Sequence, residues 1–209
     1  MNVLALANDR QKEELLALPV NDSIQIKWMT DIAPGTDQSF DVCIDLLFEN
    51  NPGRIEWLKN SGASLIIINS VDTRLQDLHK DFIRINGWNT FLKRPVVEAA
   101  AYNTELKAKA EELFLNLGRK TEWVADITGF ITPRVVAAII NEAFFALEEK
   151  VSTREEIDIA MKTGTNYPYG PFEWSEKIGL SAVYSVLMAL SKEQSRYQPS
   201  ILLKQAVLA

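Results

Sequence analysis

The side-chain types that most often do nucleophilic or acid–base chemistry are nearly absent from this chain. Among 209 residues there is one cysteine, Cys43, and one histidine, His79. Cys43 lies inside the apolar run Val42–Phe48, which predicts a buried thiol in a strand and excludes an internal disulfide. His79 lies in a charged segment that we expect to be helical, Val71–Lys80, where a solvated surface histidine is expected. The cysteine and histidine content therefore predicts no metal site.

A second unusual stretch is G-T-N-Y-P-Y-G-P-F-E-W at residues 164–174. Two glycines and two prolines in eleven residues predict a tight, irregular turn. Helical segments are expected on either side of it, at Glu155–Thr163 and Trp174–Leu190. Aromatic residues beside such a turn most often pack against one another.

The elements that must position these residues alternate in the first half of the chain. Apolar runs predict strands, and amphipathic segments with capping residues predict helices. Asn8 or Asp9, Pro52 or Gly53, and Asn103 or Thr104 are expected at helix starts. The order indicates an α/β sheet. The expected strands are Val3–Ala7, Ile24–Met29, Asp41–Phe48, Ala63–Asn69, Phe82–Asn86, Pro95–Ala100 and Glu122–Ala125; the expected helices are Asp9–Leu18, Pro52–Ser61, Val71–Lys80 and Thr104–Leu117; Ala33–Phe40 is expected to be a loop.

The second half of the chain is expected to be all-helical. Thr132 is predicted to cap a helix with Pro133 at its first position, and apolar residues recur at helical spacing through residue 147. Ser152 with Glu155 predicts a capping box for the next helix. Helices are also expected at Ser181–Lys192 and Ser200–Leu208. The change lies near residues 126–130, which predicts two domains, 1–128 and 129–209.

The composition bounds the partners and the compartment. The chain is 47% apolar and 24% charged, which is typical of a globular protein. Its net charge of −6 argues against nucleic acid as a partner, because phosphate binding needs a cationic face. No apolar stretch is long enough to cross a bilayer, and no signal peptide is evident. A cytoplasmic location is expected.

Several blocks of the second half are similar to one family. The segment D-I-T-G-F-I-T-P-R at 126–134 resembles D-x-P-G-F-I-x-N-R, which opens the helical domain of 3-hydroxyacyl-CoA dehydrogenases. The turn at 164–173 resembles the G-x-x-Y-P-x-G-P-F-E turn of the same domain. Glu142 and E-I-D-I-A-M-K at 156–162 follow the family order and spacing.

The first half resembles the family less closely. D-V-C-I-D-L-L-F-E-N at 41–50 is similar to the family strand D-L-V-I-E-A-I-x-E-N, and N-G-W-N-T at 86–90 with P-V-V-E at 95–98 resembles H-F-F-N-P with K-L-V-E. The chain is identified as a divergent family member. The resemblance implies an α/β plus all-α fold: a reduced Rossmann-like domain, then a helical domain of the 6-phosphogluconate-dehydrogenase C-terminal type.

The resemblance also implies where a site would lie. Family dehydrogenases use a histidine base oriented by a glutamate, and the matching positions here are Asn86 and Glu98. Asparagine cannot act as a base near neutral pH, and His79 lies off the family position. Asn89 matches a family asparagine that either contacts a ligand or caps a turn. The family's substrate-binding serine has no clear equivalent in N-S-V-D-T-R at 69–74, where Ser70 and Thr73 are both candidates.

The cofactor contacts depart from the family pattern. A dinucleotide-binding first turn needs G-x-G-x-x-G, because only glycine lets the backbone approach the pyrophosphate. Residues 7–12 read A-N-D-R-Q-K and place an aspartate where phosphates would lie. Asp31 lies at the distance expected of a ribose-binding acid. The short interval between the strands ending at Met29 and beginning at Asp41 indicates a trimmed domain, and Pro133 replaces a family asparagine.

Two functions follow from the resemblance. The first is a non-canonical or inactive homologue with no cofactor, which binds an acyl-CoA-like ligand through a cluster such as Lys93 and Arg94 or acts as a dimeric scaffold. The alternative is an active NAD-dependent 3-hydroxyacyl-CoA (3-hydroxybutyryl-CoA) dehydrogenase of fatty acid metabolism with divergent cofactor contacts, in which water or Glu98 is the base. The resemblance implies a homodimer through the helical domain, where apolar stripes on Thr132–Glu148 and Ser181–Leu190 suit the contact; the alternative is that both stripes pack inside one subunit. Three aromatic residues and one proline of the turn would line an acyl pocket or pack together, and packing is expected: Tyr167, Pro168, Phe172 and Trp174.

Overall fold

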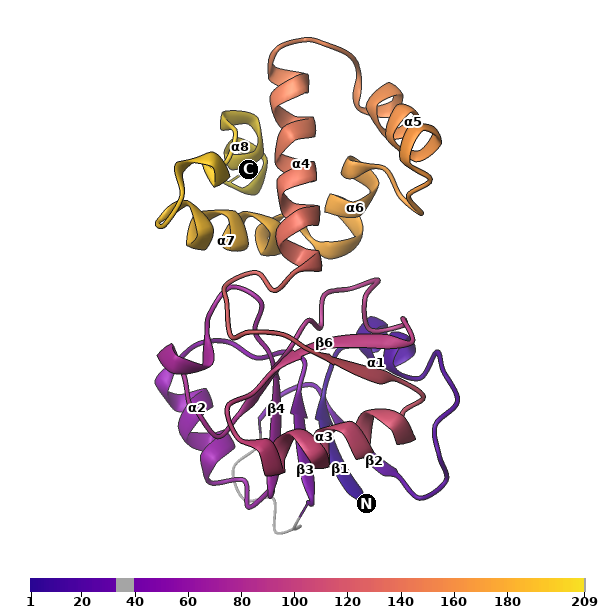
Figure 1. The fold of residues 1–209 in the computed structure, drawn as a ribbon, viewed down its shortest axis with the longest axis vertical. Coiled ribbons are helices and arrows are strands. Elements are labelled where there is room, and N and C mark those ends of the chain that lie inside the picture. Colours follow the sequence, from indigo (N-terminus) through magenta and orange to yellow (C-terminus); the bar gives the residue numbers. More distant parts are fainter. Residues whose placement is uncertain (33–39, 209) are drawn as a thin grey trace. The chain divides into compact units, whose positions relative to one another are not determined.

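The computed structural model describes residues 1–32 and 40–208, so the predicted loop Ala33–Phe40 lies almost wholly outside the described residues. The chain divides into two compact units, Met1–Phe130 and Ile131–Ala209. The first unit is α/β and the second is all-helical, as the sequence patterns predict (Figure 1).

The first unit is built on a seven-stranded sheet in the order β2-β1-β3-β4-β5-β6-β7. The five strands from β2 to β5 are mutually parallel, β6 runs antiparallel to β5, and β7 is parallel to β6. This is a Rossmann-like arrangement with the change of strand direction near one edge. The strands are β1 (Asn2–Leu6), β2 (Gln25–Met29), β3 (Val42–Asp45), β4 (Leu65–Asn69), β5 (Ile83–Ile85), β6 (Val96–Ala100) and β7 (Lys120–Trp123).

Helices cover both faces of this sheet (Figure 1). Leu15 of α1 (Asp9–Leu15) and Phe114 of α3 (Thr104–Asn116) pack on one face, and Leu58 of α2 (Pro52–Lys59) packs on the other. The central strands are therefore buried on both sides, which explains their continuous apolar runs. Asn8, Asn51 and Asn103 cap the three helices through their side chains, so these predicted starts are confirmed.

The predicted helix Val71–Lys80 is wrong. Only a single 3-10 turn forms, η1 (Leu75–Asp77). The Thr73 carbonyl, which a helix would need, accepts from the fully buried Arg84 at 2.7 Å. The Asp126 carboxylate accepts from the Leu75 and Gln76 amides. These bonds to distant residues outweigh local helix propensity. His79 consequently lies in a loop and not on a helix.

The second unit is formed by five helices. The long helix α4 packs against α6, α7 and α8 (Figure 1). Two boundary predictions are wrong by small amounts: the capping box is Thr153 with Glu156, one residue later than expected, and no side chain caps α4, whose first residue is Thr132. The helices are α4 (Thr132–Glu148), α5 (Arg154–Thr165), α6 (Pro171–Ile178), α7 (Leu180–Ser191) and α8 (Ile201–Leu208), with a 3-10 turn η2 (Ser195–Tyr197).

The segment Trp174–Leu190 is two helices and not the single helix expected. Gly179 separates α6 from α7 with a φ of 98°, a conformation that side-chain-bearing residues rarely adopt. The apolar pattern continues across the break because both helices bury residues against α4, so periodicity alone does not reveal it.

The glycine–proline turn is held by acids from α5 and α6. The Asp158 carboxylate accepts from the amides of Phe172 and Glu173, and Glu173 accepts from the amide of Gly170 at 3.0 Å. A Cβ on Gly170 would lie 2.3 Å from the Asp158 carboxyl carbon, so the turn needs glycine there. Lys162 of α5 donates to Glu173. The family-like blocks at 156–162 and 164–174 therefore form one structural unit.

The aromatic residues of this turn pack as expected. Phe172 is buried against Phe144, with ring centroids 5.1 Å apart. Trp174 is also buried and lies against Tyr167, at 5.3 Å between centroids. Pro168 is exposed. These contacts stabilise the helical unit.

Candidate functional site at the carboxyl edge of the sheet

The polar side chains of the first unit gather where the parallel strands end. In open α/β sheets, ligands bind outside the carboxyl ends of the strands, at the point where strand order reverses. Here that point lies between β1 and β3, which are neighbours although α1 and β2 separate them in the chain. Gln11, Asn69, Asn86 and Glu98 all belong to elements that reach this edge.

Asn86 and Glu98 form the pair that the resemblance implies. The Asn86 amide donates from Nδ2 to Glu98 Oε2 at 3.1 Å, and the Asn86 backbone N–H donates to the Glu98 carbonyl at 3.0 Å. Asn86 is buried and Glu98 is half-buried. Asn86 Oδ1 accepts from the Trp88 amide at 3.3 Å, which fixes the orientation of the side-chain amide. The carboxylate is therefore held by an amide donor and not by an imidazole.

The start of α1 is closed by its own side chains. Asn8 Oδ1 accepts from the Gln11 amide at 2.9 Å, and Gln11 Oε1 accepts from the Asn8 amide at 3.0 Å. Gln11 also donates from Nε2 to the Leu46 carbonyl at 2.8 Å, just beyond β3. Gln11 is buried, so its side chain spans the gap between the ends of β1 and β3.

A second bridge continues this chain of hydrogen bonds along the edge. Asn69, the last residue of β4, donates from Nδ2 to the same Leu46 carbonyl at 3.2 Å. Its Oδ1 accepts from the Gly87 amide at 2.9 Å. A Cβ on Gly87 would lie 2.7 Å from Asn69 Cγ, so this approach needs glycine. Gln11, Leu46, Asn69 and Gly87 thus connect β1, β3, β4 and the end of β5 through direct bonds.

The loop after Asn86 is held in a strained conformation. Thr90 has a φ of 78°, which is unfavourable for a β-branched residue. Its amide donates to both carboxylate oxygens of Glu14, each at 2.7 Å, which offsets the strain. The buried Arg119 donates to the carbonyls of Glu14 and Leu92, and burial lowers the pKa of Arg119 to about 10.

Two buried oxygens in this loop lack partners. Asn89 Oδ1 and Thr90 Oγ1 accept no hydrogen bond from any residue of the described part of the chain. Buried polar atoms in native proteins nearly always have a partner, so these oxygens mark a place where a donor is missing. From the sequence, Asn89 was expected either to contact a ligand or to cap a turn.

The predicted ribose acid Asp31 lies beside a buried ion pair. Arg54 donates to both oxygens of Asp45, at 2.6 and 2.7 Å, and its Nη1 lies 3.7 Å from Asp31. Burial raises the pKa of Asp45, which the hydrogen bond from Arg54 opposes. The side chain of Asp31 is 86% exposed. Arg54 thus connects Asp31 to the end of β3.

The remaining predicted residues are spread over the unit. Ser70 is buried and donates to the Thr73 carbonyl at 3.0 Å, so its hydroxyl proton is used internally. Arg94 lies over the Phe91 ring, and Lys93 is exposed.

His79 precedes β5 whereas Asn86 follows it, so the histidine lies at the opposite end of that strand. Cys43 is fully buried in β3, and burial raises the pKa of its thiol to about 12.

Sequence reasoning missed Gln11, Asn69 and Glu14. Each acts through a partner 18 to 76 positions away, which no local pattern reveals. The one usable signal was Gln11, because Asn8 with Gln11 has the spacing of a capping box. Among residues 1–32 and 40–208, no group of three or more His, Cys, Asp or Glu is arranged to hold a metal, and no helix is long and apolar enough to span a membrane.

The helical unit matches a domain found in known proteins. Residues 129–209 match the model of the 3-hydroxyacyl-CoA dehydrogenase C-terminal domain. The chain is 37% identical to the 3-hydroxyadipyl-CoA dehydrogenase of Escherichia coli K12 over 115 residues, which are 54% of this chain and 24% of that protein. A probable 3-hydroxyacyl-CoA dehydrogenase of Caenorhabditis elegans is 28% identical over 96% of this chain and 70% of its own length.

A solved structure matches both units. The (S)-3-hydroxybutyryl-CoA dehydrogenase of Ralstonia eutropha superposes with a TM-score of 0.75 at 21% identity, over 99% of this chain and 93% of that one. At this identity the match shows the fold alone. The sequence match to the Escherichia coli relative covers about a quarter of that protein's length.

Proposed function

We infer that this chain is a member of the 3-hydroxyacyl-CoA dehydrogenase family, and we propose that it is a non-canonical member without NAD-dependent hydride transfer. The proposal rests most on one observation. Gln11 fills the gap between the ends of β1 and β3 and bonds to Asn8 and Leu46, where the coenzyme's diphosphate lies in a dinucleotide-binding fold. The residues present at 7–12 do not fit that group.

The second support for the proposal is that Asn86 stands where family dehydrogenases have the histidine that acts as general base. A general base must accept a proton from the substrate hydroxyl near neutral pH. Asn86 Nδ2 carries only donors, and it donates them toward Glu98. The hydride acceptor and the imidazole base are separate requirements, and this chain departs from the family pattern at both.

An acyl-CoA-like ligand is the proposed occupant of the edge. Asn89 Oδ1 and Thr90 Oγ1 have no hydrogen-bond partner in the described part of the chain. Both oxygens can accept a hydrogen bond, and the amides of a pantetheine chain can donate one. Lys93 and Arg94 follow in the same loop and would favour the phosphates of coenzyme A. In a calorimetric titration, acetoacetyl-CoA should bind wild-type protein more tightly than the Asn89→Ala variant. Equal affinities, or no binding to either, would reject this ligand.

Turnover decides between this proposal and an active dehydrogenase, which the retained carboxylate of Glu98 favours as a second candidate. NADH oxidation is followed at 340 nm with acetoacetyl-CoA, beside an active family dehydrogenase as positive control. We expect no rate above the enzyme-free reaction. A rate that Glu98→Ala abolishes would instead establish the alternative, with Glu98 as the proton-handling group.

We also propose a homodimer formed through the helical unit and a cytoplasmic location. Val135 and Ile131 are 49% and 55% exposed near the start of α4, and a cavity of about 550 Å³ is lined by Val135, Ile139 and Phe145. Ile201 of α8 is 67% exposed. Light scattering at micromolar concentration should give twice the 23.6 kDa chain mass; a monomer mass would reject the dimer.

A further inference from the structure

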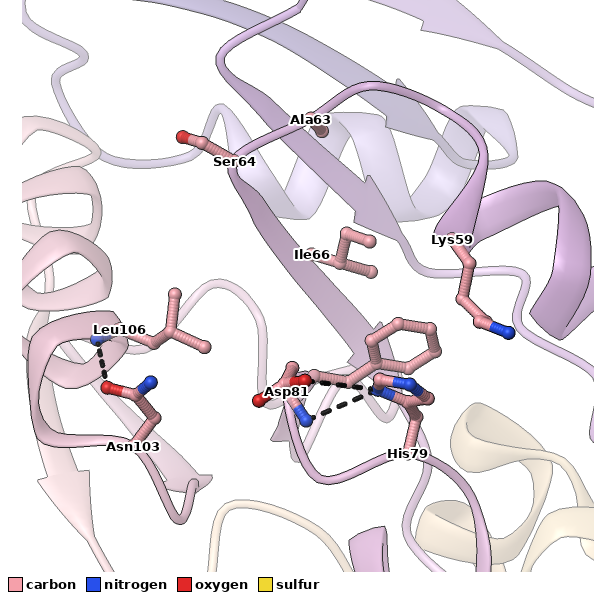
Figure 2. A pocket seen from close by; sticks show the side chains of 9 residues that line it. Lys59, Ala63, Ser64, Ile66, His79, Asp81, Asn103 and Leu106 are labelled. Atoms are coloured by element: carbon pink, nitrogen blue, oxygen red, sulfur yellow. Dashed lines mark hydrogen bonds and ion pairs between the residues drawn. The ribbon is translucent and has the colours of Figure 1, made fainter.

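A separate cavity opens at the amino edge of the sheet, away from the ends of β1, β3 and β4. It has a volume of about 370 Å³ and contains the only histidine of the chain (Figure 2). Ile66 near the start of β4 and Phe82 just before β5 form its apolar floor, with Leu106 of α3 at one side. Lys59 at the end of α2 and Asn103 at the start of α3 lie at its rim.

Three side chains that line this cavity, Lys59, His79 and Asn103, carry hydrogen-bond donors. His79 Nδ1 accepts from the Asp81 amide at 3.3 Å, so the neutral ring carries its proton on Nε2. Asn103 Oδ1 accepts from the amides of Glu105 and Leu106, which leaves Nδ2 as the donor end of that side chain. Lys59 is a cation with donors only.

The electrostatic setting also favours an anion. Asn103 stands at the N-terminus of α3, a helix of 13 residues whose dipole is positive at that end. Asp81 is the acid on the lining; its side chain is 73% exposed, so solvent screens its charge. Lys59 pairs with Glu56 at 3.2 Å, and a surface pair of this kind is weak enough to exchange for a ligand.

A flat or apolar ligand body fits the floor. The His79 and Phe82 rings stack with centroids 4.9 Å apart and an interplanar angle of 32° (Figure 2). The histidine ring is half-buried and belongs to the lining of the cavity. Aromatic faces prefer offset or edge contacts with further rings.

We propose that this cavity is a second ligand site, which takes a small organic carboxylate with an apolar or aromatic body. The carboxylate accepts hydrogen bonds from Lys59 and His79 Nε2, and the body packs on Ile66, Phe82 and Leu106. The site lies in the α/β unit, and its lining does not include Gln11, Asn86 or Glu98. The proposal is therefore independent of the function proposed above.

The single histidine makes the test site-specific. A ¹H–¹³C NMR spectrum of the imidazole has one Cε1–Hε1 signal, which reports on His79 alone. Phenylacetate is titrated at constant pH, with phenylacetamide as the uncharged isostere and acetate and inorganic phosphate as anions without an apolar body. We expect a saturable shift with phenylacetate at millimolar concentration, and little or none with the other three compounds.

Variants at the rim separate the site from a general surface effect. Lys59→Met should weaken phenylacetate binding about tenfold, because it removes a charge-assisted hydrogen bond. Lys80→Met, an exposed lysine off the lining, is the matched control and should bind as wild type does.

Three results would overturn the proposal. The first is no shift of the His79 signal with phenylacetate. The second is an equal response to phenylacetamide, acetate or phosphate, which would mean that the cavity does not recognise both charge and body. The third is unchanged affinity in Lys59→Met.

Discussion

At the scale of single residues, Gln11 is the side chain on which the functional account depends most. One glutamine satisfies two backbone groups at once, the Asn8 amide and the Leu46 carbonyl, and it is buried while doing so. Glycine at a dinucleotide-binding turn leaves space and exposed amides. Gln11 instead bonds to the Asn8 amide and the Leu46 carbonyl, and our proposal is that these bonds exclude the coenzyme.

Replacing Gln11 should therefore lower stability. Gln11→Ala loses both hydrogen bonds and leaves the Leu46 carbonyl with one donor, so the free energy of unfolding should fall by about 2 kcal/mol. Urea unfolding followed by circular dichroism measures it. Glu13→Ala, an exposed position of the same helix, is the control and should change stability by less than about 0.5 kcal/mol. Equal effects would contradict the bridging role.

Gly170 in the helical unit is likewise a position where a substitution should lower stability. Gly170→Ala places a methyl group 2.3 Å from the Asp158 carboxyl group, which must then release the amides of Phe172 and Glu173. Stability should fall by about 2–3 kcal/mol. Gly164→Ala has nothing within 4 Å of the new methyl group and should be neutral or stabilise by about 0.5 kcal/mol. A stable Gly170→Ala protein would show that the turn does not need glycine.

At the scale of elements, most strands and helices could be predicted because their signals are local. The apolar runs of β3 and β4, the caps at Asn8 and Asn103 and the helix start at Pro52 are confirmed. The failures have long-range causes: the helix expected at Val71–Lys80 is replaced by bonds from Arg84 and Asp126. For the candidate site, the resemblance identified Asn86 with Glu98, but the Gln11 and Asn69 bridges arise only when distant strands pair.

The junction of α5 and α6 should depend on pH through Glu173. Hydrogen bonds from Lys162 and the Gly170 amide lower the pKa of Glu173. An acid whose pKa is lower in the folded state contributes stability above its unfolded pKa, about 4.3, and loses that contribution as the pH falls through its folded pKa. The unfolding free energy of wild type should therefore decline more steeply with acidification than that of Glu173→Gln. Parallel profiles would contradict this role.

At the scale of the whole molecule, the two units make different contributions. The helical unit carries the family-like sequence blocks, and their residues hold the turn at 164–174 together. The α/β unit has the Rossmann-like sheet, and Gln11 bonds to the Leu46 carbonyl at its carboxyl edge.

Cys43 reports on opening of the α/β unit alone. It is the only thiol, it is fully buried, and its pKa is raised to about 12, so the native thiol should react very slowly with a disulfide reagent. Gln11→Ala should accelerate labelling, whereas Gly170→Ala should leave the rate unchanged if the two units open independently. Equal acceleration by both substitutions would show that the units unfold together.

The central claim is that residues 7–12 do not accept a dinucleotide, and calorimetric titration of the purified chain with NADH tests it most directly. An active family dehydrogenase titrated under the same conditions is the positive control. The account predicts no saturable heat at millimolar NADH for wild type. Saturable binding near one NADH per chain would contradict it, because Gln11 would then have to leave the gap between β1 and β3.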